Sequence, residues 1–359
     1  MEAIARLSGA DRRALFAAVA SQPGSALPRP VSVEIIEKDA WVCFVLKRLF
    51  SLPLLRGEGP DPGIVFKGGT SLSKAFGLIR RFSEDVDLTL DSAFFGVKLA
   101  PVDASRSQQD KQTKAARAGC DGFVSGPLRA ALDEDVASVL GGGDWVLPAT
   151  DDKSTLSFAY PRVGEGGGYL LPTVQLEFGA RSEREPWSRR PVIAYAAQAR
   201  PNAQLGVAFE IPVLAAERTF WEKATLLHAE NALARMPNDR HPTWKRFSRH
   251  ASDLAAMADT EIVRSAIVDE PLLRRVCDCK QGRFRESHVD YRSIHRANIE
   301  IVPRGALAAA LAADYVGMRS MFFEDPPPWD EVVGRLGALE ARIAALPACR
   351  STDGGRGSA

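Results

Sequence analysis

Two aspartates one residue apart are the side chains of this sequence that most clearly point to chemistry. Asp85 and Asp87 lie in the segment SEDVDLTL. If this segment is a strand, the two carboxylates point to one face, and Val86, Leu88 and Leu90 point to the other. Neighbouring carboxylates repel each other, so such a pair near a core favours a cation between them. The pattern predicts a Mg²⁺ pair for two-metal nucleotidyl transfer, with a solvated acidic strand end as the alternative.

A glycine pair precedes the aspartates at a predicted strand-to-helix turn. An apolar run at residues 64–66 is followed by Gly68 and Gly69, and Thr70 or Ser71 is suited to cap a helix. Uncovered backbone amides at a helix N-terminus can receive phosphate oxygens. We therefore predict that the nucleotide-binding segment consists of Lys67, Gly68, Gly69, Thr70 and Ser71.

The helix that follows the glycines is expected to extend to about Arg80. Its apolar residues recur at helical spacing, so one face should pack on a sheet. Those residues are Leu72, Ala75, Phe76 and Ile79. On this pattern, Lys74 and Arg80 can stay in solvent.

The whole stretch FKGGTSLSKAFGLIRRFSEDVDL resembles motif I of the AbiEii/AbiGii-type toxin family, a branch of the DNA polymerase beta-like nucleotidyltransferases. The general superfamily pattern has Gly-Ser where this chain has Gly69-Thr70, and threonine keeps the hydroxyl. The resemblance implies a polymerase-beta-like core, an NTP substrate and a pair of metal-binding carboxylates at Asp85 and Asp87.

A third acidic residue lies on a later strand-like run. The runs 155–160 and 169–178 are joined by a glycine-rich segment, which is typical of a β-hairpin. If the second run lies beside the aspartate strand, Glu177 becomes a third carboxylate of the site. Polymerase-like transferases use such an acid as a general base or a metal ligand. The alternative is a surface glutamate on an alternating strand.

Two helical segments past Pro212 carry further candidates. Helices are predicted at 214–231 and 244–258. The first contains AERTFWEKATLLH and the second RHASDLAAM, which resemble the third and fourth motifs of the same family. The resemblance assigns Lys223 to the nucleotide phosphates and Asp253 to positioning that lysine or the substrate. His228 and His250 are interpreted as surface or packing residues.

Two basic stretches leave their function open. Residues 186–200 interleave arginines with Trp187 and Tyr195, and a second group lies between Arg274 and Arg296. Either stretch could bind an RNA backbone or form an ordinary solvated surface.

The composition is typical of a globular protein and disfavours a protein that coats nucleic acid or spans a membrane. The chain has 359 residues, of which 45% are hydrophobic and 25% charged, with a net charge of +1. Such a balance disfavours bulk electrostatic coating of nucleic acid. Five scattered cysteines, the lack of an apolar run of membrane length and the lack of a signal peptide predict a cytoplasmic protein. Cys277 and Cys279 form a C-x-C pair without the partners that a zinc site needs.

The expected architecture is α+β, with a small mixed sheet and helices as the core and a C-terminal helical domain. We divide the chain into a helical segment at 1–58, the core at 59–212, the helical domain at 213–346 and a disordered tail at 347–359. Further helices are expected at 11–20, 33–52, 107–118, 123–140, 306–321 and 329–346. The start of the second, Glu37-Lys38-Asp39, also resembles the helix that precedes the core in the family.

The family resemblance implies a toxin of a type IV-like toxin–antitoxin or abortive-infection system. Its activity would be Mg²⁺-dependent transfer of NMP from an NTP to RNA, especially the 3′ acceptor end of tRNA, and a cognate antitoxin would neutralise it. Two alternatives remain open on the sequence. One is transfer to a protein hydroxyl or to a small molecule such as an aminoglycoside, and the other is a nucleotide-binding module without turnover.

Overall fold

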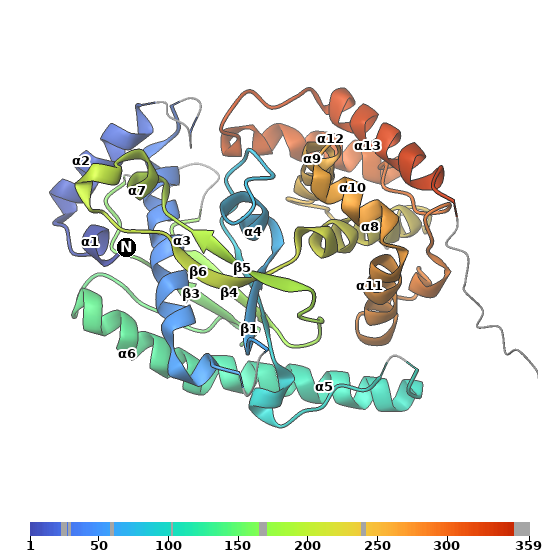
Figure 1. Cartoon of the computed structure of the whole chain (residues 1–359), viewed down its shortest axis with the longest axis horizontal. Coiled ribbons are helices and arrows are strands. Elements are labelled where there is room, and N and C mark those ends of the chain that lie inside the picture. The colour runs from blue at the N-terminus through green and yellow to red at the C-terminus, as the bar shows by residue number, and fades with distance from the viewer. Residues whose placement is uncertain are drawn as a thin grey trace, which may run out of the picture.

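A six-stranded mixed sheet lies at the centre of the molecule, with helices on both sides (Figure 1). The computed structural model describes residues 1–22, 27, 30–57, 61–101, 103–164, 171–237 and 242–347. Helices from the N-terminal part of the chain cover one side of the sheet, and helices from residue 216 onward gather on the other. The predicted α+β architecture is confirmed.

The strands run in the order β3-β4-β2-β1-β6-β5. Their bounds are Ile64–Lys67 for β1, Val86–Leu90 for β2, Thr155–Phe158 for β3, Val174–Gly179 for β4, Trp187–Val192 for β5 and Phe209–Leu214 for β6. β2 pairs antiparallel with β1 and parallel with β4, and β3 and β4 form the predicted antiparallel pair. The residues that join β3 to β4 include 165–170, which lie outside the described part of the chain.

The helices before the last strand are α1 Glu2–Ala5, α2 Gly9–Ala20, α3 Val33–Ser51, α4 Gly68–Lys74, α5 Arg106–Phe123, α6 Arg129–Leu140 and α7 Tyr195–Ala199. The π-helical segment Val124–Leu128 joins α5 to α6. The later helices are α8 Ala216–Leu233, α9 Ser248–Met257, α10 Glu261–Val268, α11 Glu270–Arg283, α12 Gly305–Gly317 and α13 Trp329–Ala344. Every helix predicted from apolar periodicity is present, with shifted ends.

The helix after the glycine pair is shorter than predicted. α4 ends at Lys74, and Gly77 adopts a left-handed φ of 64°. The Leu78 N–H then returns to the Leu72 carbonyl at 2.9 Å. The expected continuation to Arg80 is therefore wrong, because glycine allows the chain to reverse where another residue would have continued the helix.

The basic stretch at 186–200 lies partly in the sheet, since residues 187–192 form β5 and residues 195–199 form α7. β5 forms the edge of the sheet and pairs antiparallel with β6, which pairs in turn with β1. The sequence did not reveal β6 because Pro212, which marked the predicted start of the helical region, lies inside it. Proline cannot donate to a ladder, so it usually argues against an interior strand.

Three consecutive charged residues of α3 are buried. Glu37 accepts hydrogen bonds from the backbone N–H groups of Val163 (2.6 Å) and Gly164 (3.0 Å). Lys38 pairs with Glu84 at 2.5 Å. Besides the packing role expected for this helix, Glu37 therefore fixes the segment after β3, and Lys38 fixes the segment before β2.

The third charge, Asp39, pairs with Lys74, which the sequence analysis expected to stay in solvent. Its Oδ1 pairs with Lys74 Nζ at 2.6 Å, its Oδ2 accepts from the Tyr195 N–H at 2.6 Å, and the Lys74 side chain is 4% exposed. Lys74 Nζ also lies 3.5 Å from the centre of the Tyr195 ring. Lys74 is thus a core residue and not a solvated one, because Asp39 and an aromatic face replace its water.

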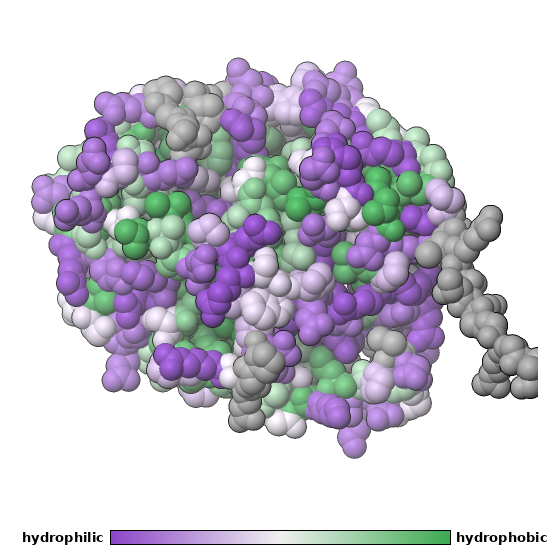
Figure 2. All heavy atoms as spheres, viewed as in Figure 1, coloured by the Kyte–Doolittle hydropathy of each residue, from purple (hydrophilic) through white to green (hydrophobic). Residues whose placement is uncertain are grey.

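Hydrophilic residues cover most of the face shown in Figure 2, and hydrophobic residues lie between them in small groups. Within the described ranges, no helix is both long and apolar enough to cross a membrane. Cys43, Cys120, Cys277 and Cys279 are free and buried. The predicted tail beyond Pro347 falls outside the described residues, and the proposed domain boundaries stay predictions.

The Lys74–Asp39 pair yields a stability prediction. Lys74→Met should lower the free energy of unfolding by about 3–5 kcal/mol, because it leaves the Asp39 carboxylate buried without its counter-ion. The additional change Asp39→Asn should restore part of this loss. Urea denaturation of the two single variants and the double variant measures the coupling.

Arg80→Met is the matched control, since Arg80 pairs with Glu324 at the surface, where the two side chains are 58% and 45% exposed. That change should cost less than about 1 kcal/mol. Equal losses for Lys74→Met and Arg80→Met would contradict a structural role for the buried pair.

Candidate active site

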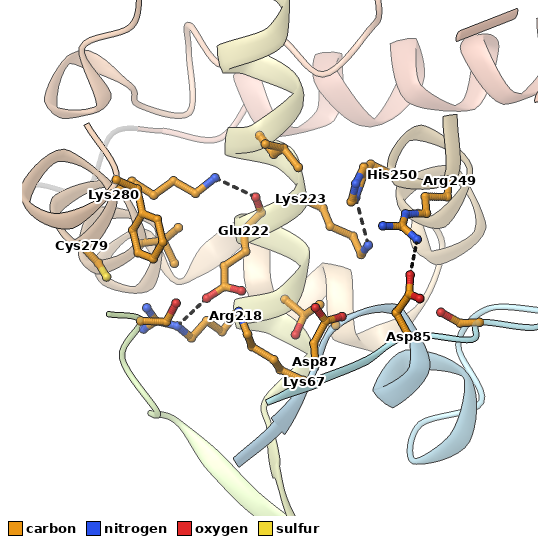
Figure 3. Close-up of a pocket in the computed structure, with 18 of the residues that line it drawn as sticks. Lys67, Asp85, Asp87, Arg218, Glu222, Lys223, Arg249, His250, Cys279 and Lys280 are labelled. Atoms are coloured by element: carbon orange, nitrogen blue, oxygen red, sulfur yellow. Dashed lines mark hydrogen bonds and ion pairs between the residues drawn. The ribbon is translucent and has the colours of Figure 1, made fainter. Parts of the chain in front are cut away.

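A cavity of about 340 Å³ lies between the sheet and the later helices. Its walls come from the β1–α4 turn and β2 on one side and from α8, α9 and α11 on the other (Figure 3). The sheet side contributes Lys67, Gly68, Gly69, Asp85 and Asp87, and the helical side contributes Glu222, Lys223, Arg249, His250 and Lys280 among others.

The glycine turn and the aspartate strand touch each other at the cavity. Lys67 and Asp87 are register partners at the end of the β1–β2 pair. Gly68 has a φ of +80°, and a Cβ built on it would lie 1.9 Å from Asp87 Oδ2. Any other residue type would push the Asp87 side chain away, so glycine lets the turn and this carboxylate lie in direct contact.

Asp87 and Glu177 are neighbours on adjacent strands, and Asp85 lies two residues before Asp87. Val86, Leu88 and Leu90 are buried, while Asp85 and Asp87 are half-buried at the cavity. Glu177 is the register partner of Asp87 on β4; it is exposed and does not line the cavity wall itself. The predicted two faces of the strand, and the position of Glu177 beside it, are thus observed.

Burial, reinforced by neighbouring negative charges, raises the pKa of two of these carboxyl groups. Partial withdrawal from water, followed by the charges of Asp87 and Asp85, raises the pKa of Glu177 to about 7. Burial also raises the pKa of Asp87, with Asp85 adding to the effect and Lys67 and Arg249 opposing it. A positive charge placed among the three carboxylates would relieve this repulsion.

Thr70 and Ser71 lie behind the turn. Both are buried; the Thr70 hydroxyl donates to the Asp85 carbonyl, and the Ser71 hydroxyl donates to the Gly68 carbonyl at 2.9 Å. Neither lines the cavity. In this structure their hydroxyls hold the turn and the strand together, and direct contact with phosphate stays a prediction.

Lys223 and Asp253 meet across two helices. Lys223 Nζ lies 3.0 Å from Asp253 Oδ2. Arg81, from the segment after α4, donates to the same carboxylate from Nε (2.7 Å) and Nη2 (2.9 Å). Although burial alone would raise the pKa of Asp253, Arg81 and Lys223 lower it. Asp253 therefore orients two cations while remaining outside the cavity wall itself.

His250 is a neutral neighbour of Lys223. Its Nδ1 lies 3.3 Å from Lys223 Nζ. Burial, followed by the positive charges of Lys223 and Arg249, lowers the pKa of His250 well below 6.5. Neutral Nδ1 can accept a hydrogen bond from the ammonium group, so His250 helps to aim Lys223 without adding charge.

Arg249 is a site residue that the sequence did not single out. It is the second residue of α9, and its Nη1 donates to Asp85 Oδ2 at 2.9 Å. It lies four residues before Asp253, on the same face of one helix. That spacing, inside a motif already recognised, was the available signal.

The opposite end of the cavity is formed by α8 and α11. Arg218 Nε donates to Glu222 Oε1 at 3.2 Å, and Lys280 Nζ donates to the Glu222 backbone carbonyl at 3.0 Å. Burial lowers the pKa of Lys280 to about 8. Apolar and aromatic walls surround these groups, contributed by Leu226, Val276, Phe284 and Tyr291. This end can receive a planar, partly polar group.

The donor set at Asp85 and Asp87 fits Mg²⁺. It consists of carboxylate oxygens, which this ion prefers, and Mg²⁺ in nucleotide sites is held by one or two carboxylates plus substrate phosphates. Within the described residues, no three acidic, histidine or cysteine side chains converge closely enough to form a metal centre by themselves. Asp85 and Asp87 would thus supply the protein part of such a nucleotide-linked Mg²⁺ site.

Comparison with known proteins identifies the family of the chain. The model of the family "Nucleotidyl transferase AbiEii toxin, Type IV TA system" matches residues 54–335. No curated protein matches the chain. MenT4, a nucleotidyltransferase toxin from Mycobacterium tuberculosis H37Rv, aligns with 17% identity and a TM-score of 0.41 over 92% of this chain and 98% of that one. Because the family match covers well over half of the sequence, the chain belongs to the AbiEii family of nucleotidyl transferase toxins of type IV toxin–antitoxin systems.

Proposed function

We propose that this chain transfers a nucleoside monophosphate from an NTP to RNA, with the 3′ acceptor end of tRNA as substrate and Mg²⁺ as cofactor. The observation that carries the chemistry is the meeting of the Gly68 turn with Asp87 and Asp85 at one cavity. The RNA acceptor is supported by the family resemblance alone. As a toxin, the protein would act in the cytoplasm, where NTPs and tRNA are present, and a cognate antitoxin would restrain it.

The triphosphate is proposed to lie on the glycine turn. Gly68 and Gly69 line the cavity, and they have no side chain to keep phosphate oxygens from their backbone. Asp85 and Asp87 would hold Mg²⁺, which when bound polarises the phosphate under attack and orients the acceptor hydroxyl.

Lys223 would neutralise the charge that develops on the leaving pyrophosphate. Burial lowers the pKa of Lys223, and Asp253 opposes that effect. With Asp253 and His250 both contacting Nζ, the ammonium group is already oriented before the substrate binds. Such preorganisation is the main way in which a protein stabilises transferred phosphoryl groups.

Glu177 is proposed to accept the proton of the attacking hydroxyl. Its pKa of about 7 suits a general base at neutral pH, and it lies beside Asp87 at the accessible edge of the site.

The activity itself can be tested by label transfer. Incubation with each labelled NTP, Mg²⁺ and total tRNA should label RNA for at least one NTP, and Asp85→Ala should abolish the signal. Asp91→Ala is the control, because Asp91 follows the same strand but pairs with Arg184 away from the cavity. Label in a protein or small-molecule fraction would overturn the RNA acceptor, and no pyrophosphate release with any NTP and acceptor would overturn the enzyme.

Two left-handed glycines give a matched pair of variants. Gly68→Ala and Gly77→Ala should each cost about 1 kcal/mol of stability, because alanine is strained at positive φ. A Cβ at Gly77 meets open space, whereas one at Gly68 displaces the Asp87 carboxylate. Gly68→Ala should therefore lose about 100-fold or more in kcat, and Gly77→Ala should keep its activity. Similar activity in the two variants would argue against the close approach.

Cation binding should release protons at neutral pH. With a pKa of about 7, Glu177 is about half protonated at pH 7 before the ion binds. A cation at Asp85 and Asp87 favours the ionised form and lowers that pKa, so protons leave and apparent affinity rises between pH 6 and 8. Calorimetric titration with Mn²⁺ in two buffers of different ionisation enthalpy measures the release. Glu177→Gln should abolish it, and a buffer-independent heat in the wild type would contradict the assignment.

A further inference from the structure

Two arginines contact acidic residues of the site in different ways. Arg81 is 3% exposed, and its three side-chain nitrogens donate to Asp253 (Nε and Nη2) and to the Phe82 carbonyl (Nη1, 3.0 Å). The Arg249 side chain is 34% exposed, and within the described residues it makes one hydrogen bond, from Nη1 to Asp85. Arg81 is locked in place, whereas Arg249 holds its partner with one of its donor groups.

The backbone that carries Arg249 is fixed. Asp314 of α12 accepts from the backbone N–H groups of Arg246 (2.6 Å) and Ser248 (2.9 Å) and from the Ser248 hydroxyl (2.5 Å). These bonds satisfy donors at the start of α9. Any change in the contact between Arg249 and Asp85 is therefore a rotation of the long side chain and needs no movement of the helix.

The position of Arg249 conflicts with a cation at Asp85. Its guanidinium lies against the carboxylate that would hold the ion (Figure 3). Although burial works against its charge, Asp85 and Asp87 raise the pKa of Arg249, so it stays positive. A divalent cation at the aspartates would repel it. An NTP on the glycine turn would bring new negative charge to the same cavity, and guanidinium groups bind phosphate with several parallel hydrogen bonds.

We propose that Arg249 is an exchangeable counter-ion: it neutralises Asp85 in the nucleotide-free protein, is displaced by the divalent cation, and then binds the phosphates of the NTP that arrives with that cation. This inference rests on the proposed function for the identity of the ligands. It implies that the ion alone binds poorly, and that the ion and the nucleotide favour each other's binding.

The test measures binding and not turnover. In the absence of nucleotide, Arg249→Gln should bind Mn²⁺ about tenfold more tightly than the wild type, because the guanidinium that competes for Asp85 is gone. Electron paramagnetic resonance of Mn²⁺ measures this binding. In saturating Mg²⁺, the same variant should bind nonhydrolysable α,β-methylene NTPs at least about tenfold more weakly by calorimetry, each base being tried in turn. Arg249→Lys keeps the charge and should bind Mn²⁺ like the wild type.

The two effects of Arg249→Gln have opposite signs, which separates them from a folding defect that would weaken both. Unchanged or weaker Mn²⁺ binding by Arg249→Gln would overturn the exchange. Unchanged binding of the NTP analogues would likewise overturn it. Asp85→Ala reports on the proposed function separately: loss of Mn²⁺ binding in that variant supports the metal site, and equal binding in the wild type and Asp85→Ala overturns the site itself.

Discussion

The structure depends on the balance of charge around one cavity between the sheet and the later helices. Asp85 and Asp87 line the cavity, and Asp253 lies directly behind it. Asp253 pairs with Arg81, from the segment after α4, and with Lys223 of α8. Asp85 pairs with Arg249 of α9, and the charge of Lys67 at the end of β1 acts on Asp87. A buried charge without a partner costs several kcal/mol, whereas a paired one contributes little net stability. These contacts therefore specify how the sheet and the later helices face each other more than they stabilise the fold.

The glycine turn and the aspartate strand are also held together by direct contacts. Because Gly68 has no side chain, Asp87 can lie directly against the backbone of the turn that lines the cavity. Thr70 and Ser71 then use their hydroxyls to tie the turn to Asp85 and to itself. The segment that would bind phosphate and the strand that would bind metal are thus one rigid unit, so neither can shift without moving the other.

The sequence predicted the local parts of this arrangement and missed most of the distant ones. Alternating residues were enough to assign the two faces of β2, and the glycine-rich hairpin placed Glu177 on a plausible strand. The pairs Arg81–Asp253 and Lys74–Asp39 join residues far apart in the chain, and no periodicity encodes them. β6 was hidden by Pro212, since strand propensity could not outweigh a residue that usually interrupts ladders. Arg249 could have been predicted as a site residue from the sequence, because its i,i+4 spacing to Asp253 places both on one helix face.

Helix α8 links the two ends of the cavity. Glu222 and Lys223 are consecutive residues of this helix; Lys223 is directed toward Asp253 and His250, and Glu222 toward Arg218 and the end near Lys280 (Figure 3). If the nucleobase occupies that far end, its contacts bear on the same helical turn that aims Lys223. A wrong base that shifts this turn would misplace the ammonium group, and a small misplacement is costly in phosphoryl transfer. Base selection and chemistry would then be coupled through one backbone segment, with no need for a separate sensing element.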